Sequence, residues 1–327
     1  MKKYDIVIVG GGPAGLAAAI SAKQQGIENI LILEREEELG GIINQCIHTG
    51  FGIHVFKENI TGPEYAQRLI DKVLSMNIDI KLNTTVLEVN NNKEITSINP
   101  KEGIFTIYTR SIILATGSKE RPRGTINIPG SRYAGIYTAG TVQKFINFEG
   151  YMPGKNVVVL GTGDIALIMA RRMCIEGAKV KAVVETRPYC YGKEENVLEC
   201  IDEFKIPLKL KHTVLSIKGK DRVEGVTIAK VDENKKPLKD TETYIPCDSL
   251  IISVGLCSES DLIKKTKINL HEVTLAPEVN ENLETPIEGI FACGNMIHMY
   301  NTADKVTIEG RELGIRASQY IKKKISA

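Results

Sequence analysis

The stretch "YDIVIVGGGPAGLAAAISAKQQG", residues 4–26, decides the fold. Its apolar run from Ile6 to Val9 is typical of a buried strand, and the alanine-rich run after the glycines predicts a helix that ends at Gly26. A second apolar run, "NILILE", follows and ends on Glu34. Strand, helix and strand in this order predict a βαβ unit, the building block of a parallel sheet covered by helices.

The glycines of this unit have the spacing GxGxxG. Gly10 suits a tight turn, Gly12 lets the backbone approach a pyrophosphate, and Gly15 lets helix and strand pack closely. Pro13 stands at the helix start, where a missing N–H is harmless. Free N–H groups at the helix N-terminus attract an anion, and Glu34 can accept hydrogen bonds from a ribose. We therefore expect a dinucleotide to bind here.

A second unit begins at residue 156, where "NVVVLGTGDIALIMARRMCIEGAKVKAVVE" repeats the design. Its fingerprint consists of Gly161, Gly163 and Ala166, and Glu185 ends its second strand. Two fingerprints predict two dinucleotides in one chain. Glu185 would bind a ribose diol and repel a 2′-phosphate, which favours NADH over NADPH, although Arg187 could neutralise such a phosphate.

Composition sets broad limits. A chain of 327 residues with 43% hydrophobic and 25% charged residues suits two globular domains. The net charge of +2 indicates no nucleic-acid partner. No apolar run approaches the length of a membrane span, and the N-terminus has no signal-peptide pattern, so we expect a cytoplasmic chain.

The cysteines show no CxxC motif and no metal-type cluster, so we expect reduced thiols and no metal. The stretch "GGIINQCIHTGFG", residues 40–52, contains Cys46, with His48 two places further on. The next cysteine in the chain is Cys174. Cys46 therefore has no near neighbour with which to form a redox pair.

Four motifs together carry a family resemblance: "VGGGPAGL", "SIILATGS" (111–118), "VLGTGDIA" and "TPIEGIFACGN" (285–295). In this order they resemble the pyridine nucleotide-disulfide oxidoreductase superfamily, in its short, thioredoxin-reductase-like form. The resemblance covers nearly the whole chain and implies a doubly wound α/β fold with two Rossmann-like domains. It implies an FAD-binding domain at 1–118 and 248–327, with an NAD(P)-binding domain inserted at 119–247. The segments "SKERPRGTINIPG" and "TYIPCDSL" would form the two connections between these domains.

The resemblance also implies the cofactor-binding residues. The first fingerprint would bind FAD, the ATG strand end would close over it, and a helix starting near Lys305 would point its N-terminus at the flavin. Asn295 stands where the family usually has Asp, but an amide can still bond a ribityl hydroxyl. The expected FAD residues are Gly10, Gly12, Pro13, Ala14, Gly15, Glu34, Arg35, Gly40, Gly41, Ile42, Gln45, Val86, Ala115, Thr116, Gly117, Gly294, Asn295, Lys305 and Val306. The expected NAD(H) residues are Gly161, Gly163, Asp164, Ile165 and Glu185.

The dithiol patterns of the family, CxxxxC after the Gly-Gly or CxxC in the nucleotide domain, are missing from this sequence. Electrons are therefore expected to leave the flavin without a cysteine pair. The family's corresponding segment runs beside the flavin, so Asn44, Gln45, Cys46, His48 and His54 would line its reactive face. We take Cys46 and His48 as the catalytic candidates, since an imidazole can exchange protons near neutral pH. A loop whose histidines only pack the flavin is the alternative.

A closer resemblance lies in "GGIINQCIHTGFGIHVFKENITGPEYAQR", "GTGDIALIMARRM" and "FACGNMIHMYNTADKVTIEGRELG". These are similar to the CxxC-lacking flavoprotein subunits that accompany glycerol-3-phosphate, opine, proline or sarcosine dehydrogenases. They imply an FAD-dependent oxidoreductase that moves electrons between NAD(P)H and a small-molecule or protein acceptor, or a dehydrogenase partner subunit. His298 and Tyr300 would lie near the flavin. An atypical disulfide reductase and a non-catalytic FAD-binding subunit stay open, as does a homo-oligomer.

Overall fold

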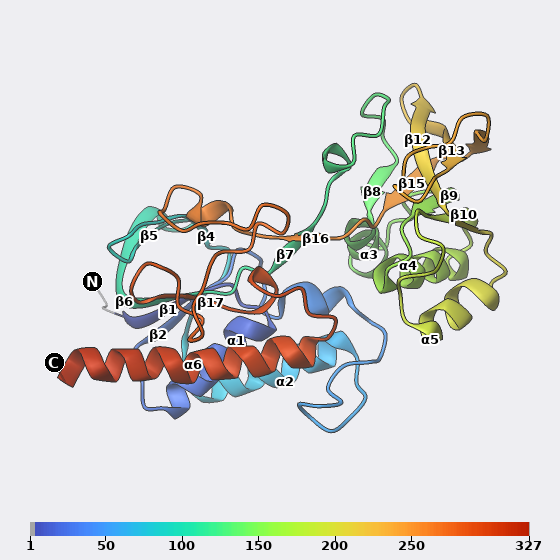
Figure 1. Cartoon of the computed structure of the whole chain (residues 1–327). Coiled ribbons are helices and arrows are strands. Elements are labelled where there is room, and N and C mark those ends of the chain that lie inside the picture. Colours follow the sequence, from blue (N-terminus) through green and yellow to red (C-terminus); the bar gives the residue numbers. More distant parts are fainter. Residues whose placement is uncertain (1–3, 327) are drawn as a thin grey trace. The chain divides into compact units, whose positions relative to one another are not determined.

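The chain folds into two compact units in the computed structural model, which describes residues 4–326 (Figure 1). The first unit comprises the residues up to Lys119 and those from Leu256 onward, and the second comprises Glu120–Gly255. The chain therefore leaves the first unit once and returns to it once. Each unit contains one of the two fingerprints, and the assignment of a cofactor to each unit stays a prediction.

The first unit is a mostly parallel sheet with helices packed on it. Its helices are α1 (Pro13–Gln24), α2 (Gly62–Ser75) and α6 (Ala303–Ser326). Its strands are β1 (Tyr4–Val9), β2 (Ile30–Leu33), β3 (Asp79–Lys81), β4 (Thr85–Val89), β5 (Glu94–Asn99), β6 (Gly103–Leu114) and β17 (Ile290–Ala292), while β7 (Ser118–Glu120) and β16 (Leu256–Ser258) form a separate pair. The sheet order is β3-β2-β1-β6-β5-β4, and β17 pairs with β6. The expected βαβ unit is β1-α1-β2, and its two strands are parallel.

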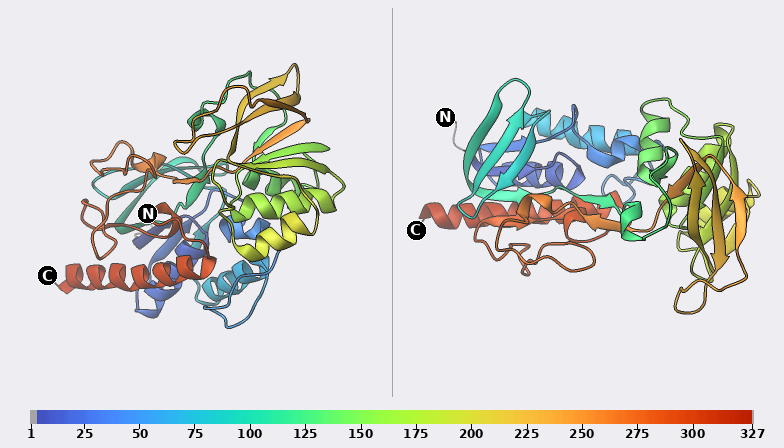
Figure 2. Two further views of the ribbon diagram at one scale, coloured as in Figure 1. Left: turned by 45° about the vertical axis from the view of Figure 1, so that its right-hand side comes forward. Right: turned by 90° about the horizontal axis from the view of Figure 1, so that it is seen from above.

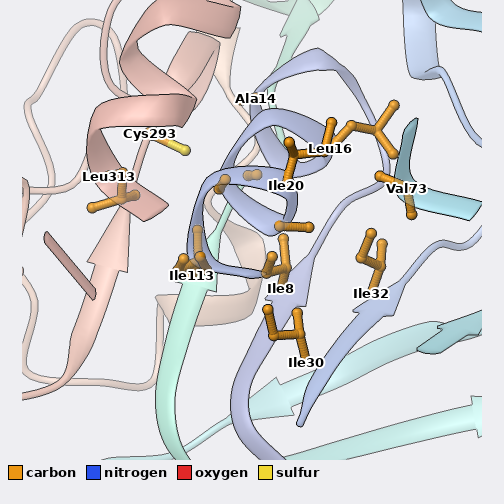
Figure 3. Packing of buried hydrophobic residues seen from close by; sticks show 14 of the residues in the cluster. Ile8, Ala14, Leu16, Ile20, Ile30, Ile32, Val73, Ile113, Cys293 and Leu313 are labelled. Carbon is orange, nitrogen blue, oxygen red and sulfur yellow. The ribbon is translucent and has the colours of Figure 1, made fainter. Parts of the chain in front are cut away.

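Alternate residues of β1 and β2 face opposite sides of the sheet, as the period of a strand requires. The isoleucines of the two strands pack in one cluster with α1, α2 and α6: Ile6, Ile8, Ile30 and Ile32. Figure 3 shows Ile8, Ile30 and Ile32 in this cluster. The valines and leucines between them pack in a second cluster with Val86 and Ile95 of the antiparallel strands β4 and β5. Burial on both faces explains why these strands read as continuous apolar runs.

Helix α6 connects the C-terminal part of the first unit to its N-terminal fingerprint. It packs along α1, and both views in Figure 2 show it, in red, beside the strands and helices of this unit. Leu313 and Ala317 of α6 share the core cluster with Ala14 of α1. The middle of α6 is therefore packed against α1, with Gly310 at the first turn of α1.

The second unit has three layers. Its helices are α3 (Ala139–Asn147), α4 (Asp164–Ile175) and α5 (Glu194–Val197). Its strands are β8 (Ile136–Thr138), β9 (Asn156–Leu160), β10 (Lys179–Glu185), β11 (Leu208–Leu210), β12 (His212–Gly219), β13 (Val223–Lys230), β14 (Thr243–Pro246) and β15 (Ser249–Ile252). A parallel sheet of order β11-β10-β9-β15-β8 lies between the helices and an antiparallel sheet β12-β13-β14 (Figure 1). Val157 and Val159 of β9 face α3 and α4, whereas Val158 and Leu160 face β12 and β13.

The second expected boundary, between residues 247 and 248, is wrong. The segment expected as a connection, "TYIPCDSL", forms β14 and the beginning of β15. Ser249 of β15 pairs with Val157 of β9, and Leu250 pairs with Ile136 of β8, so β15 is an inner strand of the second sheet. Hydrogen bonds on both edges therefore tie this segment to the second unit, which ends at Gly255.

Three further features concern the kinds of chemistry open to the chain. Within residues 4–326, none of the helices combines the length and apolarity needed to cross a membrane. The same residues contain no group of three or more His, Cys, Asp or Glu side chains arranged to hold a metal ion. None of the seven cysteines, all of which the structure describes, forms a disulfide.

Candidate functional site

The turn between β1 and α1 depends on its glycines. The φ angle of Gly10 is +110°, and a Cβ there would lie 2.3 Å from the carbonyl oxygen of Ala115. A Cβ on Gly15 would lie 2.0 Å from the carbonyl oxygen of Gly10. Gly12 is the N-cap of α1, and no side chain caps the helix there. The N-terminal N–H groups of α1 are thus left to bind an anion.

A buried carboxylate is fixed beside this turn. Glu34 follows the last residue of β2 and is 7% exposed. Its Oε2 accepts a 2.7 Å hydrogen bond from the backbone N–H of Gly11, and its Oε1 accepts a 3.0 Å bond from the N–H of Glu36. Charge-assisted bonds of this kind are strong and directional. They hold the carboxylate at the strand end, where a ribose hydroxyl could donate to its remaining lone pairs.

Segments far apart in the sequence meet at the same turn. A Cβ on Gly41 would lie 3.1 Å from Cα of Gly12, so the loop after β2 touches the fingerprint directly. A Cβ on Gly294 would lie 2.9 Å from Cβ of Ala14, in the first turn of α1. The ATG strand end, the Gly-Gly loop and the segment after β17 therefore surround one helix N-terminus.

The second unit repeats this construction around Glu185. This carboxylate is 6% exposed at the end of β10. Its Oε2 accepts a 2.6 Å bond from the hydroxyl of Thr162, inside the glycine turn, and its Oε1 accepts a 3.0 Å bond from the N–H of Arg187. Gly163 is the N-cap of α4 and again no side chain caps the helix. The Arg187 guanidinium stacks over the ring of Tyr191, 4.4 Å from its centroid.

The loop after Gly41 contains the two catalytic candidates. Cys46 is half-buried, with Sγ 3.7 Å from the carbonyl oxygen of Ile42. His48 is also half-buried: its Nδ1 lies 2.7 Å from the carbonyl oxygen of Thr49, and its ring centroid lies 5.3 Å from that of Phe51. The short distance between Nδ1 and a carbonyl oxygen assigns the proton to Nδ1 in the neutral ring. Nε2 of His48 is then the nitrogen that can accept a proton.

This loop is anchored to α6 by a buried carboxylate. Asp304, in the first turn of α6, is 2% exposed and accepts hydrogen bonds from the N–H groups of Val55 (2.9 Å) and Gly52 (3.2 Å). The hydroxyl of Tyr65, on α2, donates a 2.7 Å bond to Oγ1 of Thr307, one turn further along α6. The loop therefore has a defined position relative to the N-terminus of α6.

A family model described as pyridine nucleotide-disulphide oxidoreductase matches residues 4–312 of the chain. The chain belongs to this family. With the relatives described next, this membership makes it an FAD-dependent NAD(P)H oxidoreductase, as the sequence motifs indicated. The thioredoxin-reductase-like α/β fold expected from those motifs is likewise confirmed.

The individual proteins to which the chain is similar are reductases. The chain is 29% identical over 309 residues to a ferredoxin--NADP reductase of Streptococcus pneumoniae, which covers 93% of this chain and 89% of that protein. Among solved structures, a thioredoxin reductase from T. acidophilum covers 100% of both chains with a TM-score of 0.78 at 22% identity. A thioredoxin reductase from Lactococcus lactis covers 98% of this chain and 99% of its own, with a TM-score of 0.79 at 21% identity. At these identities the solved structures show the fold alone.

The expected cofactor residues of this oxidoreductase divide into three groups. In the first unit, Glu34 and Gly294 lie beside the glycine turn of Gly10, Gly12 and Gly15. In the second unit, Glu185 lies beside the glycine turn of Gly161 and Gly163. Val86 is buried in the core, so only its backbone could meet a ligand. Arg35 is exposed and lines a surface hollow of about 500 Å³ together with Asn83, Thr85 and residues of β5 and β6.

The state of the thiols matters in a family named for disulphides. Burial raises the pKa of Cys200 to about 11 and that of Cys247 to about 12. Burial also raises the pKa of Cys174, Cys190 and Cys293. These five side chains are therefore thiols at neutral pH and poor nucleophiles. Cys46 differs from them by its place in the candidate site.

The sequence motifs do not reveal Asp304 or Glu309 as members of the site. An acidic residue in the first turn of a helix is ordinary, because it is favourable with the helix dipole, and so Asp304 carries no distinctive pattern. Glu309 is 7% exposed and lies between buried positions of α6. A charged residue on the apolar stripe of a helix is the one pattern that could have indicated it.

Proposed function

We propose that the chain transfers hydride from NADH to FAD and then passes the electrons to an acceptor. One observation carries this proposal: each unit fixes a carboxylate, Glu34 or Glu185, beside a glycine turn at a helix N-terminus without a side-chain cap. One such arrangement binds one dinucleotide. Two arrangements in one chain support binding of both an electron donor and an electron carrier.

The first unit is the proposed FAD site. The N-terminus of α1 at Gly12 would bind the pyrophosphate, Glu34 a ribose, and the segment from Gly294 to Asn295 the ribityl chain. FAD supplies a ring that accepts a hydride and releases electrons singly or in pairs. The protein's part is to orient that ring, and the beginning of α6 at Lys305 contributes a positive helix pole that favours negative charge.

The second unit is the proposed pyridine nucleotide site, with NADH preferred. The Glu185 carboxylate is fixed beside the turn and would repel a 2′-phosphate while bonding a ribose diol. Two findings support NADPH instead: the stacked guanidinium of Arg187, and the name of the Streptococcus pneumoniae relative, a ferredoxin--NADP reductase. We favour NADH because the Glu185 carboxylate is bonded to Thr162 within the glycine turn.

The acceptor face is proposed to be the loop of Cys46 and His48, which Asp304 holds at the N-terminus of α6. A small molecule, an electron-transfer protein or a partner dehydrogenase subunit could approach over this loop. Its exposed apolar side chains, Ile42 (65% exposed) and Ile53 (51% exposed), suit contact with another molecule. Seven cysteines without a disulfide support a reducing compartment such as the cytoplasm.

Anaerobic titration of the FAD-loaded protein with NADH and with NADPH tests the proposal. NADH is expected to bleach the visible flavin band with a stoichiometry of one per FAD, at a lower concentration than NADPH. Protein that binds FAD but is not bleached by either nucleotide would be a non-catalytic FAD subunit. A thiolate-to-flavin charge-transfer band on reduction would instead indicate a disulfide reductase.

A further inference from the structure

A buried carboxylate on α6 collects three hydrogen-bond donors. Oε1 of Glu309 accepts a 2.6 Å bond from the backbone N–H of Gly294. Its Oε2 lies 2.7 Å from Nδ1 of His298 and accepts a 2.7 Å bond from the hydroxyl of Tyr300. Glu309 itself is 7% exposed, whereas the side chain of His298 is 51% exposed. A buried carboxylate thus holds a half-exposed imidazole. We call the side chains of Glu309, His298 and Tyr300 the Glu309 cluster.

The Glu309 cluster is part of the proposed FAD site. Gly294, which donates to Glu309, packs against Ala14 in the first turn of α1. Oδ1 of Asn295, in the segment proposed for the ribityl chain, accepts a 3.1 Å bond from the backbone N–H of Tyr300. The turn that carries His298 and Tyr300 is therefore folded directly onto the cofactor-binding segment.

His298 differs from the other four histidines in its partner. His48 and His212 place Nδ1 against backbone carbonyl oxygens, and Nδ1 of His271 accepts hydrogen bonds from backbone N–H groups. Among the described residues, only His298 has a carboxylate at its ring nitrogen. A carboxylate at Nδ1 fixes the ring orientation and the tautomer, which leaves Nε2 as the nitrogen that can exchange a proton.

Tyr300 is the third member of the Glu309 cluster, and its hydroxyl donates a hydrogen bond to Glu309. Burial, followed by its hydrogen bond to Glu309, raises the pKa of the Tyr300 hydroxyl. It remains a neutral donor to Glu309 near neutral pH. Cys293, which is completely buried near Glu309, also stays protonated because burial raises its pKa. The Glu309 carboxylate is then the shared acceptor of the group, with one oxygen facing both His298 and Tyr300.

We propose that His298 is the acid–base residue for an organic two-electron substrate with carbonyl oxygens, of the quinone class. The inference rests on the proposed function. A quinone that takes a hydride from the reduced flavin forms one O–H bond and needs a proton at its other oxygen. The N–H bond of the His298 imidazolium breaks, its proton forms the second O–H bond, the flavin is oxidised and the quinone becomes a hydroquinone. Water then returns the proton to His298.

A one-electron acceptor needs no proton donor, and this difference provides the test. His298→Asn and Glu309→Gln are compared with the wild type in NADH-driven reduction of menadione and of ferricyanide. The ratio of menadione to ferricyanide turnover is expected to fall by roughly 10²-fold in His298→Asn, the usual scale of general acid catalysis. The matched control is His271→Asn, because an amide oxygen can accept the bonds that Nδ1 of His271 accepts. Its ratio should equal that of the wild type.

A second readout is independent of turnover. In nitrogen-15 NMR spectra of the apoprotein, His298 is expected to show the Nδ1–H tautomer, with a slowly exchanging downfield proton. Glu309→Gln should shift that proton and increase the share of the other tautomer. As a positioning residue, Glu309 should thus change the spectrum and lower the turnover ratio together, with all rates expressed per bound flavin.

The two proposals fail in different ways. If NADH does not bleach the flavin at all, the proposed function is wrong. If bleaching is normal and the turnover ratio of His298→Asn is unchanged, His298 is not the acid, and the acceptor is a one-electron carrier or receives its proton from water. If only His48→Asn lowers the ratio, the loop histidine has this role and the inference about His298 is overturned.

Discussion

Oδ1 of Asp304 accepts a 2.9 Å hydrogen bond from the backbone N–H of Val55, 249 residues away in the sequence. The bond joins the first turn of α6 to the loop that carries Cys46 and His48. Because Asp304 is almost fully buried, water does not replace this bond if it is lost. This side chain therefore provides a buried link between the loop and α6.

Asp304→Ala should loosen this loop without unfolding the unit. A part-buried N–H left without an acceptor costs about 1–3 kcal/mol, or roughly one to two powers of ten in an opening equilibrium. Amide hydrogen exchange of residues 50–56 should accelerate by that factor, while exchange of β13 in the second unit serves as the internal reference. Asp304→Asn keeps one acceptor oxygen and should show a smaller effect. Unchanged exchange in both variants would mean that other contacts hold the loop.

Glu185→Gln tests the nucleotide preference by removing charge while keeping an acceptor for Thr162 or Arg187. The affinity for NADH relative to NADPH should fall, because a lost charged ribose contact is worth roughly 1.5–3 kcal/mol, about one to two powers of ten. Equilibrium binding of both nucleotides measures this ratio. The companion variant Arg187→Ala should weaken NADPH only. A ratio that responds to Arg187 and not to Glu185 would assign the preference to the guanidinium.

Cys46→Ser should leave NADH-driven reduction of ferricyanide within several-fold of the wild type. The reason is that no disulfide joins Cys46 to another cysteine and the five thiols with raised pKa are poor nucleophiles. Steady-state rates at saturating NADH provide the measurement. Complete loss of activity, with a charge-transfer band in the wild type, would restore the disulfide-reductase alternative.

His48→Asn should retain FAD and NADH binding, because these depend on the glycine turns and helix N-termini. Turnover with menadione should fall several-fold, since the ring packs against Phe51 and helps to shape the loop. The control is His54→Asn, whose side chain is exposed on the same loop. A fall of roughly 10²-fold or more for His48→Asn, and little change for His54→Asn, would identify His48 as the general acid.

Local patterns were sufficient to predict both βαβ units. The apolar run of β1, the φ angle demanded of Gly10 and the close packing at Gly15 are imposed by neighbours within one supersecondary unit. The hairpin of β4 and β5 follows the same rule: the polar stretch "NNNKE", residues 90–94, favours a turn, and the two strands are antiparallel. Such features depend on short-range geometry, and so they can be inferred from residue spacing.

Long-range contacts were decided by the tertiary structure alone. The expected boundary at 247/248 failed because β15 gains its hydrogen bonds from β9 and β8, which lie about a hundred residues earlier in the chain. The bond between Asp304 and the loop, and the pairing of Glu309 with His298, arise only when α6 packs along α1. No periodicity encodes which buried carboxylate meets which donor, because that choice depends on packing between distant segments. The sequence therefore determined the two nucleotide-binding folds, and the tertiary structure decided which polar side chains surround them.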